Sequence, residues 1–189
     1  MRVAIVSDIH GNRQAFEAVL DAIEASECEE LWCLGDLVGY GADPDACVEL
    51  ARRHAAICLA GNHDMGVRGD LPLEQFSRGA ALAARWTQET ITADTLGYLS
   101  GLEPVMLDEK VGLFHASPRD PVWEYVLSAL QADLCLDAQS HRVCLIGKQA
   151  ADLTDFRLGA GNRGCLRGFL LGAGLHFDDA AGRLDNGDQ

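Results

Sequence analysis

Four short polar clusters contain the side-chain types that bind divalent metal ions, and each cluster comes directly after a short apolar run. The clusters are Asp8–Asn12, Gly35–Asp36, Gly61–Asp64 and His115–Pro118. Their Asp, Asn and His residues supply carboxylate, amide and imidazole donor atoms, which together suit a hard or borderline cation. The clusters therefore predict a divalent metal site assembled from four separate parts of the chain.

The residues of the clusters divide naturally between two metal ions. Asp8 and His10 are two positions apart, so in an extended segment both side chains point to the same side and can hold one ion. Asp36 has carboxylate oxygens with enough lone pairs to bridge two ions. Asn62 and His115 offer an amide oxygen and an imidazole nitrogen to the second ion. Such a pair of ions would bind an attacking hydroxide and clamp the oxygens of a phosphate group in line.

His63 has a different expected role from the ligands around it. An imidazole beside a dinuclear centre is suited to protonate a departing alkoxide. Each cluster taken alone also has a structural interpretation as a loop, turn or helix cap, and Asp64 in particular is best explained as a turn or cap residue. The co-occurrence of four clusters at four strand ends favours the metal site. The remaining histidines lack this placement and are expected to be surface or structural residues: His54, His141 and His176.

The apolar runs before the clusters are short and rich in Val, Ile and Leu, which is typical of buried parallel strands. They span Val3–Val6, Leu31–Leu34, Ile57–Ala60 and Val111–Phe114. Each polar cluster then lies at the C-terminal end of a strand, which is the edge where open α/β sheets bind ligands. Distant parts of the chain can therefore meet at one point.

Helical patterns alternate with the strands, as an α/β domain requires. The expected helices span 12–25, 45–54, 73–86, 92–101 and 123–130, a further strand spans 142–146, and 104–107 pairs with 111–114 as a hairpin. Residues 67–101 are expected to form a helical cover beside the site. The segment 159–189 is Gly-rich and acidic, and its pattern indicates either a hairpin or a frayed tail.

Length, charge and cysteine content restrict the class of protein. The 189 residues suit a single domain spanning 1–189. The formal net charge of −14 argues against a nucleic-acid-binding protein, which would carry a basic stripe. No apolar run reaches membrane-spanning length. The seven cysteines include no C-x-x-C pair and the sequence opens without a leader pattern, so we expect reduced thiols in a cytoplasmic protein.

As a set, the motifs resemble those of the calcineurin-like metallophosphoesterase superfamily, and in particular its small bacterial and archaeal phosphodiesterase-like branch. The similar motifs are Asp8-x-His10, Gly35-Asp36, Gly61-Asn62-His63-Asp64 and His115. The resemblance implies a four-layered α/β/β/α sandwich, whose C-terminal part is expected to be incomplete in this chain. It implies two divalent ions, with Mn²⁺ expected first and Fe, Zn, Ni or Mg as alternatives. The implied roles are Asp8 and His10 on one ion, Asn62 and His115 on the other, Asp36 as the bridge and His63 as the general acid.

The chain departs from the family at its fifth motif, Gly-His-x-His, because it has Gly147-Lys148-Gln149-Ala150. By resemblance each missing imidazole would bind one ion, so metal binding is expected to be weakened at one or both sites. Protonated Lys148 has no lone pair to offer a metal. Three interpretations stay open: an enzyme with a weakened dinuclear or single-ion site, a degenerate protein that binds a nucleotide, metal or protein partner, and a truncated or altered form of an active enzyme.

The motifs do not define the substrate, because metal-activated hydroxide attacks monoesters, diesters and phosphoproteins alike. Resemblance to the phosphodiesterase-like branch favours a small phosphodiester or nucleotide, with a phosphoprotein as the alternative. Asn12, Arg119 and Lys148 are the candidate substrate-binding residues, and Arg68 is a further cation that could hold a phosphate, although each cation could equally be a solvated surface charge. No membrane or nucleic-acid partner is expected, and a homodimer is left open.

Overall fold

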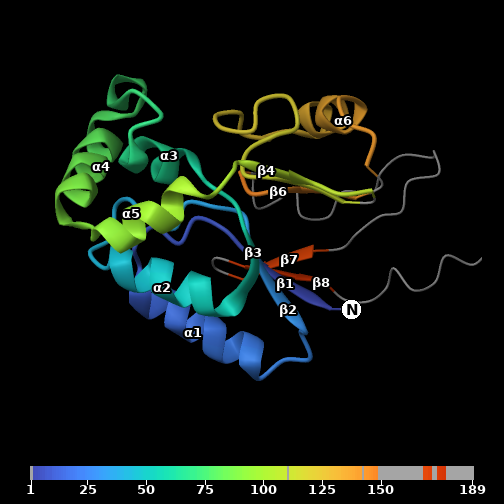
Figure 1. Ribbon diagram of the computed structural model, residues 1–189. Coiled ribbons are helices and arrows are strands. Elements are labelled where there is room, and N and C mark those ends of the chain that lie inside the picture. The colour runs from blue at the N-terminus through green and yellow to red at the C-terminus, as the bar shows by residue number, and fades with distance from the viewer. Residues whose placement is uncertain (1, 110, 142, 149–167, 172–173, 178–189) are drawn as a thin grey trace, which may run out of the picture.

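The computed structural model describes residues 2–109, 111–141, 143–148, 168–171 and 174–177, and these form four layers (Figure 1). Two helices cover the outer face of a first sheet, a second sheet packs on its inner face, and one helix covers the second sheet. This is the expected α/β/β/α sandwich. The outer layers are α1 (Arg13–Glu24) with α2 (Pro44–His54) on one side and α6 (Ala129–Asp137) on the other.

The first sheet has the strand order β3-β2-β1-β8-β7. Its strands are β1 (Val3–Val6), β2 (Glu30–Cys33), β3 (Ala55–Cys58), β7 (Gly168–Leu171) and β8 (Gly174–Phe177). β1, β2 and β3 are parallel, whereas β8 runs antiparallel to both β1 and β7. The C-terminal ends of the first three strands therefore share one edge, as expected. Of the Gly-rich segment 159–189, only β7 and β8 belong to the described residues.

The second sheet has the order β4-β5-β6, with β4 (Val105–Leu107), β5 (Val111–Phe114) and β6 (Val143–Ile146). β4 and β5 are antiparallel, which confirms the expected hairpin. β5 and β6 are parallel and pair Phe114 with Ile146. The residues that follow these two strands, His115 and Lys148, are consequently brought side by side.

The buried apolar side chains fill the three spaces between the layers. Between the first sheet and its two helices lies a cluster that includes Val6, Phe16 and Val48. Between the two sheets lies a second cluster that includes Ile5, Leu34 and Leu113. A small third cluster, Val126, Ala132 and Cys135, lies under α6. The strand ends that carry the polar clusters are held by this apolar packing on both sides of the first sheet.

Three further helices gather at one end of the two sheets (Figure 1): α3 (Asn62–Arg68), α4 (Arg78–Thr90) and α5 (Ala93–Ser100). The continuous helix expected over 73–86 is wrong. A short 3₁₀ turn, η1 (Leu73–Gln75), precedes an extended Phe76, and Ser77 then caps α4 by accepting a hydrogen bond from the Ala80 amide. The break lets the Phe76 ring contact the rings of His63 and Trp123.

The helix expected over 123–130 is also wrong, because a local turn and one long-range hydrogen bond hold most of this segment in an irregular form. Asp120 Oδ1 accepts hydrogen bonds from the amides of Val122 and Trp123, which makes a turn. The Val126 amide donates to the Lys148 carbonyl at 2.9 Å. Helix α6 begins only at Ala129, after Ser128 has capped it through the Gln131 amide.

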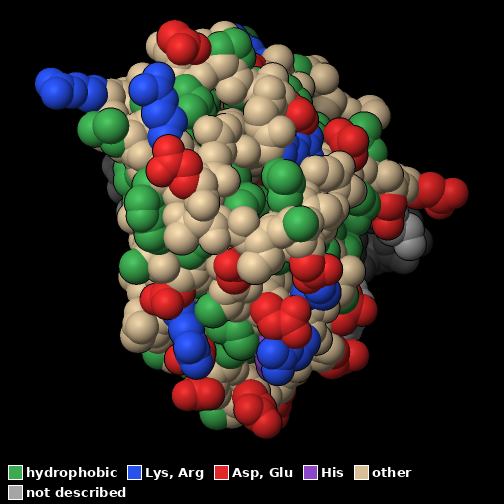
Figure 2. Space-filling model, turned by 60° about the vertical axis from the view of Figure 1, so that its left-hand side comes forward, with side chains coloured by type: hydrophobic (Ala, Val, Ile, Leu, Met, Phe, Trp, Pro, Cys, Tyr) green, Lys and Arg blue, Asp and Glu red, His purple; other side chains and the backbone are tan. Residues whose placement is uncertain are grey.

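Among the described residues, no helix is long and apolar enough to cross a membrane. The six cysteines in that part of the chain are free thiols, and Cys165 lies outside it. Figure 2 shows acidic and basic side chains interspersed on the face it presents, without a continuous basic stripe among the described residues there.

Candidate metal centre

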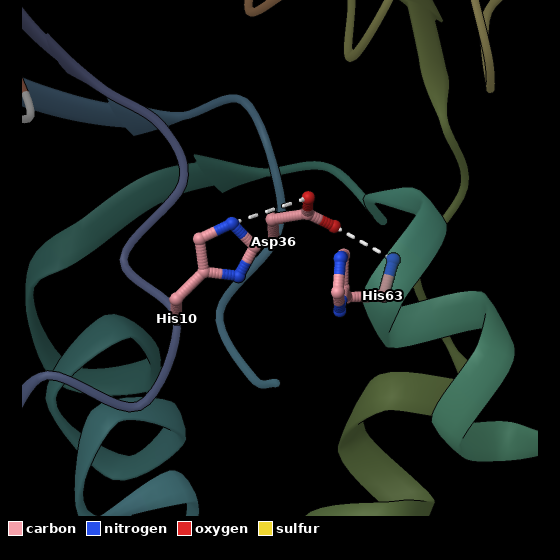
Figure 3. Close-up of side chains that lie close together, drawn as sticks. All are labelled: His10, Asp36 and His63. Atoms are coloured by element: carbon pink, nitrogen blue, oxygen red, sulfur yellow. Dashed lines mark hydrogen bonds and ion pairs between the residues drawn. The ribbon is translucent and has the colours of Figure 1, made fainter. Parts of the chain in front are cut away.

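The loops after β1 and β2 lie against each other and bring the first two polar clusters together. The amide of Asp8 donates to the Gly35 carbonyl at 3.0 Å, and the amide of His10 donates to the Asp36 carbonyl at 2.8 Å. Figure 3 shows the His10 imidazole and the Asp36 carboxylate facing each other, with His63 on the opposite side of the carboxylate. Donor atoms of these three residues lie within 4.8 Å of one another.

His10 Nε2 lies near the carboxylates of both Asp8 and Asp36. The distances are 3.8 Å to Asp8 Oδ1 and 3.7 Å to Asp36 Oδ2. Donors that each lie about 2.0–2.2 Å from a common ion are about 3–4 Å apart. His10 Nδ1 donates to the Val38 carbonyl at 3.1 Å, which fixes the ring so that Nε2 faces the carboxylates. His10 and Asp36 thus offer two donors to a divalent cation, with Asp8 near His10 Nε2. The described residues whose donor atoms all lie within 4.8 Å of one another are His10, Asp36 and His63, and Asp8 is not in that group.

His115 and Asn62 lie on the other side of the same carboxylate. His115 Nε2 is 3.6 Å from Asp36 Oδ2 and 3.3 Å from Asn62 Oδ1. His115 Nδ1 hydrogen-bonds the Leu34 carbonyl at 2.7 Å, so this ring is oriented in the same way as that of His10. Asp36 Oδ2 therefore lies between two imidazoles, as a bridging oxygen would.

Lys148 makes the two sides of Asp36 different, because it occupies only the side that Asn62 and His115 share. Its Nζ donates to Asn62 Oδ1 and to the Val122 carbonyl, the latter at 3.1 Å. The residue is only 3% exposed. The oxygen that Asn62 would offer to a second ion thus already contacts an ammonium group, and this half of the centre does not fit a second cation while Lys148 stays charged. Ala150, at the other missing histidine position, lies outside the described residues.

Three of the sequence-predicted ligands adopt left-handed backbone conformations, which are uncommon outside glycine. The φ angles are 57° at Asp8, 52° at His10 and 57° at Asp36, and Tyr40 next to them has φ 60°. The expected extended segment from Asp8 to His10 is therefore wrong, although the two side chains do converge. They converge through a tight left-handed loop. Strained backbone of this kind is concentrated at functional sites in folded proteins.

Asp64 ties the loop after β2 to the start of α3. Its carboxylate accepts hydrogen bonds from the amides of Asp36 and Gly61, both at 2.8 Å, and of Val38 at 3.1 Å. The cap expected for Asp64 is confirmed. Asp36 Oδ1 in turn accepts from the His63 amide at 2.8 Å, which leaves its Oδ2 free to face the two imidazoles.

Gly61 is required at this junction by space and not by its backbone angle. A Cβ atom at this position would overlap the carboxylate of Asp36. The close approach of the two loops, and with it the position of the bridging carboxylate, depends on a residue without a side chain.

Burial raises the pKa of the Asp36 carboxyl to about 6, and the neighbouring Asp8 adds to this effect, while the positive charges of His10 and Lys148 oppose it. A carboxylate that is buried beside another carboxylate is stabilised in its charged form by a nearby cation. The electrostatics of the pocket thus favour cation binding.

His63 lies in a cage of aromatic rings next to the predicted ligands. Its ring centroid is 4.6 Å from Tyr40, 4.7 Å from His10 and 5.4 Å from Phe76. Nδ1 is buried and has no hydrogen-bond partner among the described residues. Burial, together with the positive charges of His10, Lys148 and His115, lowers the pKa of His63 to about 3, so the free imidazole is neutral near pH 7. An anion bound beside it would shift this equilibrium toward the protonated form.

The candidate substrate-binding residues are largely engaged in other contacts. Asn12 is exposed and caps α1 by accepting from the Ala15 amide at 3.1 Å. It also lines a surface depression of ≈ 500 Å³ beside Asp8 and His10. Arg119 pairs with Glu124 at 3.3 Å. Arg68 binds Asp70 and the carbonyls of Leu99 and Leu102, so its role is structural.

The aromatic residues around the site are functional candidates that the motifs did not indicate. Tyr40 and Tyr125 are 56% and 52% exposed, and the Tyr125 ring centroid lies 4.9 Å from Lys148 Nζ. Trp123 connects Phe76 to the same lysine. Of these aromatic residues, only Tyr40 could have been expected near the site from the sequence, because it lies four residues after Asp36.

Comparisons with known proteins agree with this architecture. The sequence profile of a family described as calcineurin-like phosphoesterase matches residues 1–134. An uncharacterized protein of Methanocaldococcus jannaschii is 42% identical over 130 residues, which are 66% of this chain and 53% of that protein. A metallophosphoesterase from Sphaerobacter thermophilus is 41% identical, with a TM-score of 0.67 over 77% of this chain and 59% of its own. A putative diadenosine tetraphosphatase is 31% identical, with a TM-score of 0.50 over 64% of this chain and 53% of its own. The chain thus spans only a little more than half the length of these relatives.

Proposed function

Since this chain belongs to the calcineurin-like phosphoesterase family, we propose that it is a metal-dependent hydrolase acting on a small phosphodiester or nucleotide. One observation carries the proposal. Asp36 Oδ2 lies 3.7 Å from His10 Nε2 and 3.6 Å from His115 Nε2, and both rings are held in place through their other nitrogen. Purely structural histidines would not need to aim their free nitrogens at one buried carboxylate.

We assign Asp8, His10 and Asp36 as ligands of a divalent ion, with Mn²⁺ as the first ion to test because two of the three ligands are carboxylates. A divalent ion supplies a Lewis acid that stabilises charge on phosphoryl oxygens and activates water. Asn62 and His115 face the opposite side of Asp36. Their role toward a second ion depends on Lys148, which occupies the Asn62 oxygen.

We assign His63 as the residue that protonates the leaving-group oxygen. Its imidazole lies beside the predicted ligands and its Nδ1 is unpartnered. In the free protein burial keeps the ring neutral, since its pKa is lowered to about 3. A phosphate anion bound next to it raises that pKa and lets the ring take up the proton that it later donates.

The exposed aromatic rings favour a substrate with a flat organic group. Tyr40 and Tyr125 are both more than half exposed, and Tyr40 contacts the rings of His10 and His63 while Tyr125 lies beside Lys148. Stacking on an exposed aromatic ring is available to a nucleobase whatever its identity. The similarity to a putative diadenosine tetraphosphatase supports a nucleotide over a phosphoprotein. Lys148 supports a second candidate function, a degenerate non-catalytic protein that binds a nucleotide or a metal ion, because it replaces an expected ligand.

The test is Mn²⁺ binding by calorimetry on metal-stripped protein, together with hydrolysis of an aryl phosphodiester. Three variants decide the assignment: Asp36→Ala, His63→Ala and, as a matched control on the surface of α2, His54→Ala. We expect Asp36→Ala to lose both metal binding and hydrolysis, and His63→Ala to keep metal binding but lose hydrolysis by about 10²–10⁴-fold. His54→Ala should behave as the parent protein.

The opposite results are equally informative. Full hydrolysis by Asp36→Ala would refute the metal-dependent mechanism. Mn²⁺ binding without hydrolysis of any phosphodiester or nucleotide tried would favour the non-catalytic binding protein. A preference for phosphopeptides over nucleotides would overturn the substrate assignment while leaving the mechanism intact.

A further inference from the structure

We propose that the ammonium group of Lys148 replaces the second metal ion of this centre, so that the protein binds a single divalent ion at Asp8, His10 and Asp36. This inference rests on the proposed function, because it concerns the same site. A dinuclear phosphoesterase holds two exchangeable metal ions. Here one of the two positive charges would be an exchangeable divalent ion and the other the ammonium group of Lys148.

The topology places the Lys148 side chain where a second ion would be held. β5 and β6 are parallel neighbours, and the amide of Lys148, after β6, donates to the carbonyl of His115, after β5, at 3.0 Å. From this starting point the side chain reaches Asn62 Oδ1. Asn62 and His115 are the two residues whose donor atoms converge on this side of Asp36. The ammonium therefore contacts the same amide oxygen that a metal ion would need.

The surroundings of Lys148 resemble a binding site for a cation more than a surface position. The residue is 3% exposed, although lysine is rarely buried unless it is paired. Besides its two hydrogen bonds, Nζ lies 4.9 Å from the ring centroid of Tyr125 and 5.6 Å from that of Trp123. Cation–π contacts of this kind stabilise a desolvated ammonium. Burial lowers the pKa of Lys148, and the negative charges of Asp36, Asp8 and Asp120 oppose this effect.

A second divalent ion would either displace Lys148 Nζ from Asn62 Oδ1 or bind next to the ammonium group. Both choices are unfavourable, because an ion bound to Asn62 Oδ1 and His115 Nε2 would lie beside a fixed positive charge in a buried pocket. The ammonium group contacts Asn62, Val122 and the two rings, and among the described residues no hydrogen bond or ion pair joins it to the donor atoms of Asp8 or His10. The Lys148 ammonium group donates two of its three protons to Asn62 Oδ1 and the Val122 carbonyl. The third proton is left for a substrate oxygen.

The experiment is a measurement of metal content and magnetic state on the full chain. Metal-stripped protein is equilibrated with Mn²⁺, the bound metal is counted by elemental analysis and calorimetry, and electron paramagnetic resonance distinguishes an isolated ion from a magnetically coupled pair. We compare the parent protein with Lys148→His, which supplies a ligand, and with Lys148→Arg, a matched control that keeps the positive charge. Lys148→Met removes the charge at similar length and serves if the histidine variant does not fold, as judged by circular dichroism.

We expect one ion per chain and an isolated Mn²⁺ signal for the parent protein and for Lys148→Arg. For Lys148→His we expect two ions per chain and a coupled signal, and for Lys148→Met a second ion that binds more weakly than the first. Two ions in the parent protein would overturn the inference and leave the proposed function intact. A single ion in both Lys148→His and Lys148→Met would also overturn it, because the ammonium would then not be what excludes the second ion.

The failure of the proposed function looks different. If the parent protein binds one isolated ion but hydrolyses no phosphoester, the single-ion inference stands and the enzymatic proposal falls. If neither the parent protein nor any Lys148 variant binds Mn²⁺, the ligand assignment itself is wrong and both proposals fall together.

Discussion

Replacing Asp64 by alanine should destabilise the fold and loosen the metal centre at the same time. The carboxylate of Asp64 accepts three backbone hydrogen bonds, from Asp36, Val38 and Gly61, and so joins the loop after β2 to the first turn of α3. Alanine would leave these three amides without an acceptor in a buried region. The perturbation reaches the bridging residue directly, because one of the three amides belongs to Asp36.

The expected magnitude follows from the number of bonds lost. A buried donor left unsatisfied costs about 1–3 kcal/mol, so three donors give an upper range of about 3–9 kcal/mol. Burial raises the pKa of the Asp64 carboxyl, so removing this costly buried group offsets part of the loss. We therefore expect about 3–5 kcal/mol for Asp64→Ala. Asp64→Asn keeps one acceptor oxygen and should cost about 1–3 kcal/mol.

The assay is urea denaturation followed by circular dichroism, with and without Mn²⁺. Ser77→Ala is the matched control, because Ser77 caps α4 by accepting a single part-buried hydrogen bond from the Ala80 amide, and its loss should cost about 1 kcal/mol. Mn²⁺ affinity should fall in Asp64→Ala and stay unchanged in Ser77→Ala. If Asp64→Ala were no less stable than Ser77→Ala, the three-amide junction would not hold the site together, and this reasoning would fail.

Three further results are expected. Asp36 should contribute about 3 kcal/mol less to the stability of the metal-free protein at about pH 6 than at about pH 4, because the native state keeps its proton up to a pKa of about 6 while the unfolded chain releases it near 4. The lowered pKa of His63 acts in the opposite direction over the same pH range, so the measurement is the difference between the parent protein and Asp36→Asn in urea titrations with chelator; an equal pH dependence of the two would contradict this. Gly61→Ala should abolish Mn²⁺ binding, since its Cβ would overlap the Asp36 carboxylate, whereas Gly97→Ala, in open space within α5, should bind normally and gain up to about 1 kcal/mol. Mn²⁺ at about 100 times its dissociation constant should stabilise the parent protein by about 2.7 kcal/mol in denaturation experiments, and an equal effect on Asp36→Asn would show that the ion binds elsewhere.

The sequence predicted the parts of the fold that depend on local pattern. Short Val-, Ile- and Leu-rich runs correctly indicated β1, β2 and β5 as buried strands, and Asn12 was correctly placed at the start of α1, which it caps. The convergence of the polar clusters could be inferred as well, because it follows from where parallel strands end. The hairpin of β4 and β5 was predicted from its short polar connection.

Long-range contacts explain what the sequence could not show. The helical pattern over 73–86 gave no sign that Phe76 would leave the helix to contact His63 and Trp123. The segment 123–128 has apolar residues that suit a helix, but the Val126 amide is taken by the Lys148 carbonyl across the fold. The loss of a histidine at position 148 was visible in the sequence, whereas the contact of its ammonium group with Asn62 was not.

The left-handed backbone at Asp8, His10, Asp36 and Tyr40 has a consequence for protein engineering. Glycine or asparagine tolerates such angles better than these residues do, so a redesign guided only by thermal stability would replace them first. Each exchange would relieve backbone strain and would erase a donor atom or a ring at the centre. In a library screened for heat resistance, we therefore expect selection for stability to act against function at these four positions.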